Sequence, residues 1–205
     1  MSEKVKKQLT RKKYSEFSKY LSYLLRHHPE DVGLSLMDFG WIDLNVLIAA
    51  INISKSNNYL VTEHDIETIV VEDKKTRYTI KKLENGNKLI RANQGHSIQG
   101  LIMDFKKLSK EELPEYLYHG TSTKNLDLIE KSGEIKSMSR QYVHLSKDID
   151  TAINVGKRHG IPVVLKLSVS SMLEQGLEIS LSDNEVYLTS NIPCNCIIRE
   201  LYTVN

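Results

Sequence analysis

Hydrophobic residues in the first hundred positions recur mostly every three or four residues, the spacing of a helix with one buried face. Residues 15–28 follow this spacing, and Pro29 predicts the end of that helix. Residues 40–54 predict a short strand followed by a helix, with Asp43 as its N-cap. The chain therefore begins with helices joined by short connections.

The hydrophobic spacing changes after the third predicted helix. Thr62 is the expected N-cap of this helix, residues 62–73, with Asp65 three positions later. Residues 76–82 then alternate between hydrophobic and polar side chains, and residues 85–95 supply a turn and a partner strand. Three helices followed by a β-hairpin is the order of elements in a winged-helix module.

Strand patterns dominate the second half, after a polar joint at residues 108–116 that contains a proline. The predicted strands are residues 117–122, 142–146, 162–169, 185–190 and 196–204. Two predicted helices interrupt them, residues 123–133 and 148–160. Mixed strands with few helices favour the α+β class. We expect two lobes: a winged-helix lobe over residues 1–104 and a mixed α/β lobe over residues 105–205.

The composition is that of a soluble globular protein, with 40% hydrophobic and 26% charged residues. No stretch of about 18 apolar residues exists, so no membrane span is expected. Residues 1–17 are charged and lack the apolar region of a signal peptide, so we expect a cytoplasmic protein. Cys194 and Cys196 are too few for a zinc site and are expected to be ordinary thiols.

Positive charge is concentrated at the N-terminus, although the net charge is only +2. We call this cluster the basic head; it consists of Lys4, Lys6, Lys7, Arg11, Lys12 and Lys13. It is either a solvated tail or an arm that contacts phosphates.

Four polar clusters lie at the ends of predicted elements. They contain Arg26 with His27, Arg91 with His96, His119, and Arg140 with His144. None has the spacing of metal ligands, and no carboxylate cluster suggests magnesium, so no metal is expected. Arginine binds phosphate oxygens in pairs and histidine moves protons near neutral pH. The clusters therefore favour phosphate recognition without a metal.

Each cluster also has a purely structural interpretation. Arg26 and His27 suit the negative end of a helix dipole. Arg91 could pair with a surface carboxylate, His119 could be a turn histidine, and His144 could cap one face of a sheet.

Six segments of the sequence together resemble one family, the RNA 2′-phosphotransferases, also called tRNA 2′-phosphotransferases. The segments are LSYLLRHHPEDVGLSLMDFGWIDLNVL, IRANQGHSI, LYHGTS, MSRQYVHLS, VGKRHGIPVVLKL and VYLTSNIP, in this order. They extend over roughly residues 18 to 196. The pairing of LLRHHP with IRANQGHS is specific to that family.

The resemblance implies that the N-terminal lobe engages RNA and that the C-terminal lobe has an ADP-ribosyltransferase-like fold that binds NAD⁺. It implies an enzyme that transfers an internal RNA 2′-phosphate to NAD⁺, which is consumed, without a metal, a membrane or an obligate protein partner. The implied catalytic residues are Arg26, His27, Arg91 and Arg140. The implied NAD⁺-binding residues are His119, Gly120, Thr121, Ser122, His144, Leu145, Ser146, Gly156, Arg158 and His159. The implied RNA-binding residues are Arg26, His27, Arg91, Asn93, Gln94, His96 and Ser97.

The implied reaction has two steps. The RNA 2′-phosphate first displaces nicotinamide, which leaves as a neutral molecule, so orientation matters more than acid–base help. The ribose 2″-hydroxyl then attacks the phosphorus and releases 2′-OH RNA and ADP-ribose 1″,2″-cyclic phosphate. Arginines aimed at the phosphoryl oxygens would stabilise this second step. His27 is the natural proton carrier, and His28 is expected to make only local contacts.

The chain departs from the family pattern at one position of a late strand. The family usually reads Asn-Gly-Val-Trp, whereas this chain has Asn184, Glu185, Val186 and Tyr187. Glutamate lacks the tolerance of glycine for positive φ and adds a carboxylate. The change either is confined to the surface or alters affinity on the nicotinamide side.

Two other functions would use parts of the same pattern. An ADP-ribosyltransferase that caps nucleic-acid phosphate ends would stop at the first step. A non-catalytic winged-helix protein would need a basic recognition helix, but the helix that begins at Thr62 is acidic until its end.

Overall fold

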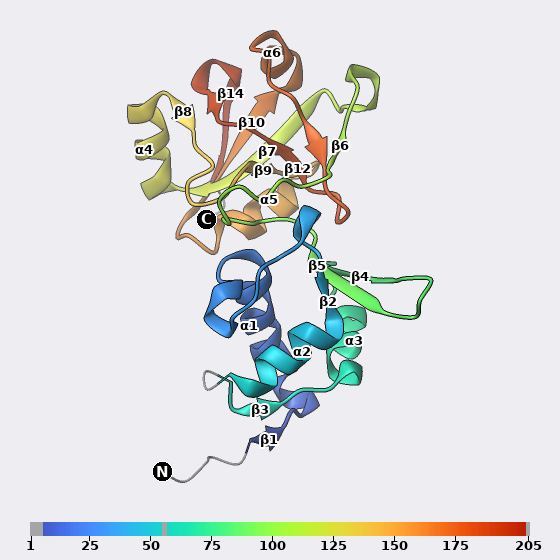
Figure 1. The fold of residues 1–205 in the computed structure, drawn as a ribbon. Helices are drawn as coiled ribbons and strands as arrows, with labels where there is room; N and C mark the ends of the chain where they lie inside the picture. The colour runs from blue at the N-terminus through green and yellow to red at the C-terminus, as the bar shows by residue number, and fades with distance from the viewer. Residues whose placement is uncertain (1–5, 55–56, 204–205) are drawn as a thin grey trace. The chain divides into compact units, whose positions relative to one another are not determined.

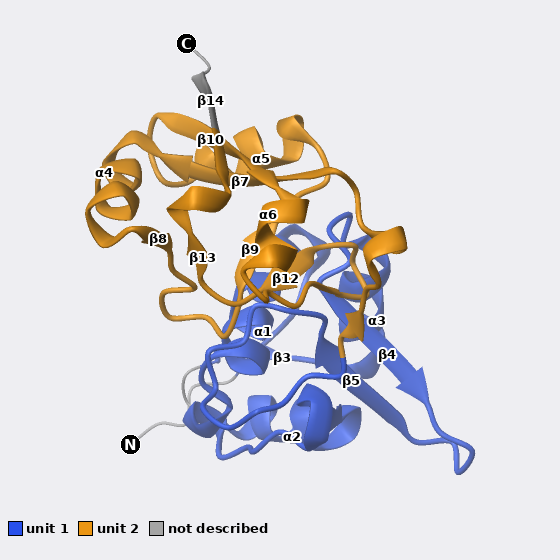
Figure 2. Ribbon diagram, turned by 90° about the horizontal axis from the view of Figure 1, so that it is seen from above, with its two compact units in different colours: residues 1–104 blue, residues 105–205 orange. Residues whose placement is uncertain are grey.

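The structure is a computed structural model that describes residues 6–54 and 57–203. The chain divides into two compact units, residues 1–104 and 105–205, coloured separately in Figure 2. Lys4 of the basic head and Val204 of the last predicted strand lie outside the described residues. Helices and strands mix in the chain as the α+β class requires. Among the described residues, no helix combines the length and apolarity needed to cross a membrane.

The first unit is built from three helices and short strands (Figure 1). Its helices are α1 (Tyr14–Arg26), α2 (Leu44–Ile53) and α3 (Glu63–Glu72). Its strands are β1 (Lys7–Gln8), β2 (Ile42–Asp43), β3 (Tyr59–Leu60), β4 (Tyr78–Lys82) and β5 (Lys88–Ala92). All three predicted helices and the predicted hairpin strands are confirmed.

The ends of these helices follow from local chemistry. Asp43 accepts hydrogen bonds from the amides of Asn45 and Val46, and Thr62 forms a capping box with Asp65, so both predicted N-caps are confirmed. The last residue of α1 is Arg26, three residues before Pro29. Proline disfavours helical geometry in the preceding residue, which explains why the helix ends there.

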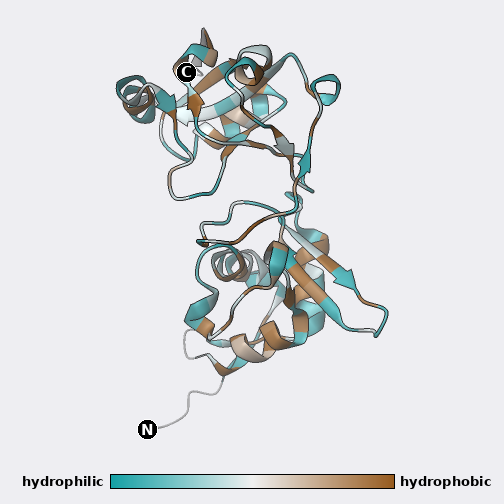
Figure 3. Ribbon diagram, turned by 45° about the horizontal axis from the view of Figure 1, so that its top comes forward, coloured by the Kyte–Doolittle hydropathy of each residue, from teal (hydrophilic) through white to brown (hydrophobic). Residues whose placement is uncertain are grey.

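The core of the first unit forms where one face of each helix meets the sheet. Helix α1 contributes Phe17, Leu21, Leu24 and Leu25, all buried. Strand β5 lies between β2 and β4 and is antiparallel to both. Hydrophilic and hydrophobic bands alternate along this hairpin in Figure 3. Because β5 is central, its last residues, including Arg91, are buried.

The described part of the basic head is not a solvated tail. Strand β1 pairs with β3, and residues 11–13 form a short 3-10 helix before α1. The Lys6 ammonium donates to the carbonyl of Ser54 at 2.6 Å, just after the last residue of α2. A cation suits the negative end of a helix.

The second unit contains more strands. Its helices are α4 (Thr123–Ser132), α5 (Ile149–Gly156) and α6 (Val169–Glu174). Its strands are β6 (Lys106–Lys107), β7 (Tyr116–Ser122), β8 (Glu134–Ile135), β9 (Val143–Leu145), β10 (Pro162–Ser168), β11 (Ser180–Leu181), β12 (Tyr187–Thr189), β13 (Ile192–Pro193) and β14 (Ile197–Thr203). The predicted strands are confirmed in place, with shifted ends.

Two sheets carry the polar motifs of this unit. Strand β10 is central and pairs antiparallel with β7 and β14, while β9 ends the second sheet, of order β6-β11-β12-β9. A bridge between Tyr118 and Ser146 joins β7 to β9. The histidines of both strands are thereby brought close together.

Three expectations about the second unit were wrong. Helix α6 was not predicted; its first residues are valine and serines, which have modest helix propensity, and the Ser168 hydroxyl caps it by accepting from Ser171 N. The helix expected over residues 148–160 ends at Gly156. Cys196 lies in a 3-10 turn and not in strand β14, and both cysteines are free thiols, as expected.

The turn between β11 and β12 places Glu185 in the left-handed region, at φ +59°, with its side chain exposed. The turn itself is hydrogen-bonded, since Glu185 N donates to Ser182 O at 2.9 Å. The backbone therefore keeps the geometry that suits glycine although the residue is glutamate.

We expect Glu185→Gly to raise the free energy of unfolding by about 1 kcal/mol, because left-handed geometry is strained for residues with a Cβ. Urea denaturation measures the change. Asp183→Gly in the same turn, where φ is not positive, is the matched control and should destabilise the protein. If the Glu185→Gly variant is no more stable than the parent, the backbone of Glu185 is not strained.

Candidate active site

The end of α1 and the loop after β5 meet in the first unit. His27 Nδ1 lies 2.8 Å from Ser97 Oγ, and Ser97 N donates to the Arg26 carbonyl at 3.0 Å. Gly95 has φ +90°, and a Cβ there would lie 3.6 Å from Arg26 Nη1. Glycine thus lets the loop turn directly beneath the Arg26 side chain. The LLRHHP and IRANQGHS motifs therefore form one structural site.

Arg91 is held in this site by three different contacts. Its Nη1 forms an ion pair with Asp104 and lies 3.4 Å from the Phe39 carbonyl. Its guanidinium stacks over the Trp41 ring, 4.6 Å from the centroid. The carboxylate partner considered for Arg91 is therefore present. The ring and the carboxylate fix the orientation of the guanidinium, whose planar fork of donors suits oxyanions.

His96 lies beneath the site rather than at its surface. The residue is only 2% exposed, and neither ring nitrogen has a hydrogen-bond partner among the described residues. Burial, with the nearby charges of Arg26, His27 and Arg91, lowers the His96 pKa to about 4. The ring is therefore neutral at pH 7. Packing encloses the ring in this conformation, and the expectation that His96 binds RNA stays a prediction.

The low pKa of His96 makes stability depend on pH. Between pH 6.5 and about 4 the unfolded chain binds a proton that the folded chain excludes, so stability falls as pH falls. The full effect is roughly 3 kcal/mol. We expect the midpoint of urea denaturation to drop across this range, and His96→Gln to flatten the drop. If the denaturation midpoint of His96→Gln drops as steeply with pH as that of the parent, the pH dependence comes from other groups, such as His119.

Asn93 also differs from its expected role. It is 1% exposed, its Oδ1 accepts from Thr79 Oγ1 at 2.7 Å, and its Nδ2 donates to the Thr76 carbonyl at 2.8 Å. The amide therefore ties the loop to the hairpin, and the expected contact of Asn93 with RNA stays a prediction. Gln94 is half-buried beside it.

In the second unit, His119 on β7 and His144 on β9 are hydrogen-bonded through backbone carbonyls. His119 Nδ1 donates to the His144 carbonyl at 3.2 Å, and His144 Nδ1 donates to the Tyr142 carbonyl at 3.0 Å. Because carbonyls only accept, each neutral ring carries its proton on Nδ1 and keeps Nε2 as an acceptor. Burial lowers the His119 pKa, and the charge of His159 lowers it further. His119 belongs to a strand and is not a turn histidine.

Arg140 and Arg158 come from two segments of the second unit, and the charge of Arg158 affects the pKa of Arg140. Residue 140 as a whole is exposed, but burial around its guanidinium lowers the pKa of Arg140, and the charge of Arg158 lowers it further. Arg158 and His159 are exposed in the turn after α5. Adjacent cations of this kind favour an anionic ligand such as a diphosphate.

Several residues expected to bind NAD⁺ are buried or closely packed, and their binding role stays a prediction. A Cβ on Gly120 would lie 1.9 Å from the Ala152 carbonyl, and one on Gly156 would lie 2.5 Å from the Thr121 carbonyl. These glycines allow α5 to pack closely against the sheet. Leu145 belongs to the core. Ser122 is buried, and its hydroxyl has no hydrogen-bond partner among the described residues.

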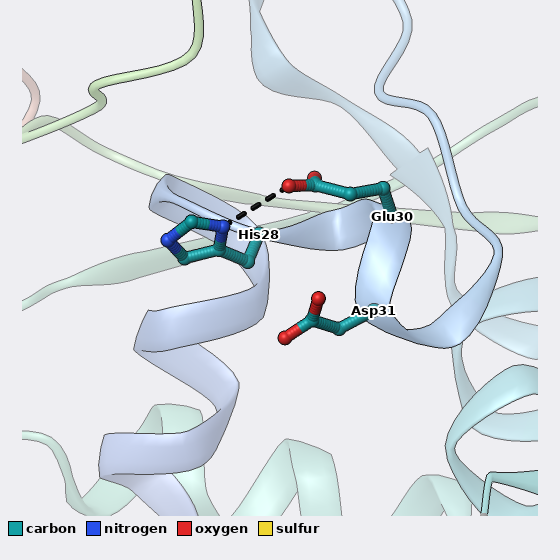
Figure 4. Close-up of side chains that lie close together, drawn as sticks. All are labelled: His28, Glu30 and Asp31. Atoms are coloured by element: carbon teal, nitrogen blue, oxygen red, sulfur yellow. Dashed lines mark hydrogen bonds and ion pairs between the residues drawn. The ribbon is translucent and has the colours of Figure 1, made fainter.

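His28, Glu30 and Asp31 form an exposed group after α1 (Figure 4). One ligand atom from each lies within 4.8 Å of the others, a geometry that the sequence spacing did not reveal. His28 Nδ1 lies 3.0 Å from Glu30 Oε1, while Asp31 Oδ2 accepts from Tyr23. The expectation that His28 makes local contacts is confirmed.

Sequence reasoning missed the residues that hold Arg91. Trp41 lies within the first of the family-like segments, and that position was the sequence signal that could have marked it. Asp104 and the Phe39 carbonyl carry no such signal, because their proximity to Arg91 arises only on folding.

The structure thus shows a two-unit α+β protein with a cluster of basic residues at a helix end beside a stacked arginine, which makes this cluster a candidate site for an anion. A model of the RNA 2′-phosphotransferase, Tpt1 / KptA family matches residues 12–191. The chain belongs to this family.

Curated relatives agree with this assignment. A probable RNA 2′-phosphotransferase of Flavobacterium johnsoniae is 43% identical, over 86% of this chain and 91% of the relative. A probable RNA 2′-phosphotransferase of Pectobacterium carotovorum is 41% identical, over 88% of this chain and 92% of the relative. One from Pseudomonas syringae pv. tomato is 36% identical, over 96% of this chain and the whole relative.

Proposed function

We propose that this protein is an NAD⁺-dependent RNA 2′-phosphotransferase that converts an internal RNA 2′-phosphate to a hydroxyl. The observation that carries the proposal is the cluster formed by Arg26, His27 and Arg91 around the neutral ring of His96. Cationic side chains around the neutral, buried ring of His96 suit a phosphate dianion. The family membership supports the same substrate.

The first unit is proposed to be a winged helix that binds RNA. The order of three helices and the sheet β2-β5-β4 supports this assignment. The second unit is proposed to be an ADP-ribosyltransferase-like lobe that binds NAD⁺. The Nε2 acceptors of His119 and His144 suit ribose hydroxyls, and the partnerless hydroxyl of Ser122 suits a polar ligand. Arg158 and His159 suit the diphosphate.

In the first proposed step, a 2′-phosphate oxygen bonds to C1″ of the nicotinamide ribose as the glycosidic bond breaks. Arg26 and Arg91 hold the phosphate against this carbon, and nicotinamide leaves with the bonding electron pair. The phosphate is already an anion and the nicotinamide ribose already carries positive charge. The rate of this step therefore depends mainly on how the two groups are positioned.

In the second proposed step, the ribose 2″-oxygen bonds to phosphorus as the bond to the RNA 2′-oxygen breaks. The attacking 2″-hydroxyl loses a proton, and the leaving RNA 2′-oxygen gains one. His27 is assigned to this proton transfer through Nε2, because its Nδ1 contacts Ser97. Arg140 is assigned to the charge on the phosphoryl oxygens.

The decisive experiment uses an oligoribonucleotide with one internal 2′-phosphate, incubated with and without NAD⁺. We expect NAD⁺-dependent appearance of 2′-OH RNA, nicotinamide and ADP-ribose 1″,2″-cyclic phosphate. Stable ADP-ribosylated RNA as the only product would favour an enzyme that caps phosphate ends. Binding without any reaction would favour a non-catalytic winged-helix protein.

Turnover is expected to need no divalent metal, because the proposed phosphate ligands are arginines. Excess chelator should leave the rate unchanged. His28→Ala provides the control, since it removes one member of the possible cation group that includes Glu30 and Asp31. Loss of turnover with chelator and recovery with magnesium would contradict the metal-free mechanism.

A further inference from the structure

An aromatic residue is exposed beside the site that holds Arg91. Phe39 lies in the short 3-10 helix Asp38–Gly40, which leads into β2 (Figure 1), and the residue is 40% exposed. Its carbonyl oxygen lies 3.4 Å from Arg91 Nη1, and the Arg91 guanidinium stacks over Trp41, two residues further along the chain. The sites described above use the carbonyl of Phe39 and leave its side chain without a role.

We propose that the Phe39 ring is a stacking platform for a base of the RNA, at or next to the nucleotide that carries the 2′-phosphate. The proposal rests on the proposed function, because that function places the phosphate at Arg91. It adds a contact with a base, whereas Arg26, His27 and Arg91 are assigned to the phosphate.

The backbone of Phe39 has a geometry that an aromatic residue rarely adopts. Its φ is +61° and its ψ is +21°, in the left-handed region that favours glycine. Among the described residues other than glycine, Phe39 is the only aromatic one with positive φ. Strained residues of this kind concentrate in proteins where a ligand is bound. The strain therefore supports a binding role for the exposed side chain.

Hydrogen bonds fix the turn that carries Phe39. Met37 N donates to the Trp41 carbonyl at 2.8 Å, and Gly40 N donates to the Met37 carbonyl at 3.1 Å. The Phe39 carbonyl, between these bonds, faces Arg91. Because the backbone is already ordered, a base that stacks on the ring removes little further conformational entropy from the protein.

Covalent geometry limits the distance between the ring and the phosphate site. A carbonyl oxygen lies roughly 2.4 Å from the Cα of its own residue, and the centroid of a phenylalanine ring lies roughly 3.8 Å from that Cα. The centroid of the Phe39 ring is therefore no more than about 10 Å from Arg91 Nη1. One or two nucleotides of an extended strand span such a distance.

A second exposed apolar residue belongs to the segment that packs against this turn. A Cβ on Gly40 would lie 3.4 Å from the sulfur of Met103, so the chain around Met103 contacts the turn of Phe39. Ile102 directly precedes Met103 and is 75% exposed. Apolar surface is therefore exposed on two touching segments next to the arginine.

The charges around this surface favour a base over a second phosphate. Asp38 is exposed beside Phe39 and would repel a phosphate, but a base is uncharged. The other nearby carboxylate, Asp104, pairs with Arg91. Each nucleotide of single-stranded RNA offers an aromatic face together with a phosphate, which matches a ring beside a guanidinium. An apolar protein partner would use the ring alone.

The test measures binding of a short fluorescent oligoribonucleotide with one internal 2′-phosphate, without NAD⁺. Phe39→Leu keeps an apolar side chain but removes the ring, and should weaken binding by roughly tenfold. Phe39→Asn should lose as much, because asparagine tolerates the left-handed backbone but cannot stack as a ring does. Phe39→Trp keeps an aromatic face and should bind at least as tightly as the parent.

Removal of single bases from the RNA locates the contact. In the parent protein, an abasic site at or next to the 2′-phosphorylated nucleotide should weaken binding by about tenfold. On that RNA, Phe39→Leu should cause no further loss, because the contact is already absent. On RNA with an abasic site elsewhere, the variant should keep its full loss. A side chain that only supported the fold would give the same loss on every RNA.

Val71→Ala is the control, since it truncates another highly exposed apolar residue of the first unit, in α3. It should bind every RNA as the parent does. Urea denaturation should show that each variant is folded.

Three results would overturn the stacking platform: parental affinity in Phe39→Leu, an equal loss on every abasic RNA, or the same loss in Val71→Ala. Removal of the 2′-phosphate without a base-specific effect of Phe39→Leu would refute the platform alone. A base-specific effect without any NAD⁺-dependent reaction would support the platform and refute the proposed function.

Discussion

His27→Ala is expected to slow the second step by roughly 10²-fold or more while the first step continues. The first step needs an oriented dianion and no proton transfer, but the second must move a proton to the leaving RNA oxygen. RNA that carries a 2′-phospho-ADP-ribosyl group should then accumulate, heavier than the substrate by one ADP-ribose. Arg140→Ala should cause the same accumulation, because charge develops on the phosphoryl oxygens in the second step.

Gel analysis and mass measurement during a single turnover detect this species directly. His28→Ala is the matched control: the neighbouring histidine contacts Glu30 and Tyr23 and should support both steps at parental rates. If the His27 and Arg140 variants yield only unreacted substrate, both residues act in or before the first step and the assignment is wrong.

Arg91→Ala is expected to slow both steps, each by about 10²-fold or more, without accumulation of the intermediate. Without the Arg91 side chain the phosphate is wrongly placed in both steps. It is the nucleophile in the first step and the group that is attacked in the second. Arg91→Lys should not restore activity, because lysine lacks the planar fork that stacks on Trp41 and binds two oxygens at once. Single-turnover rates for each step measure the effect.

Asp104→Asn separates a catalytic defect in Arg91 variants from a structural one. It removes the charge that pairs with Arg91 but keeps the guanidinium, so both steps should continue and RNA should bind more tightly. Thermal unfolding should show that each variant is folded. Parental rates in Arg91→Lys would show that charge alone suffices.

Local features could be predicted from the sequence because their causes lie within a few residues. Asp43 and Thr62 cap helices through their own side chains, and Pro29 restricts the residue before it. The hydrophobic spacing of residues 15–28 predicts the buried face of α1. The motifs around Arg26 and Arg91 also identified the family, since residue identity and order are properties of the sequence itself.

Other features depended on contacts between distant residues. His96 was expected to bind RNA, but packing against Gly40 and beside Arg26 encloses its ring and lowers its pKa. Asn93 was expected to reach RNA, but the hairpin uses its amide. Burial and partners are set by the whole fold, so a motif cannot distinguish a residue that touches a ligand from one that supports it.

The sequence by itself thus determined most of the helices, the N-caps of α2 and α3, the main strands and the kind of residues available for phosphate chemistry, because these follow from short-range periodicity and side-chain type. Only the tertiary structure decided that Asp104 and Trp41 hold Arg91 and that Gly120 and Gly156 allow α5 to pack closely against the sheet. Each of these depends on a distance between residues far apart in the chain, which folding alone establishes.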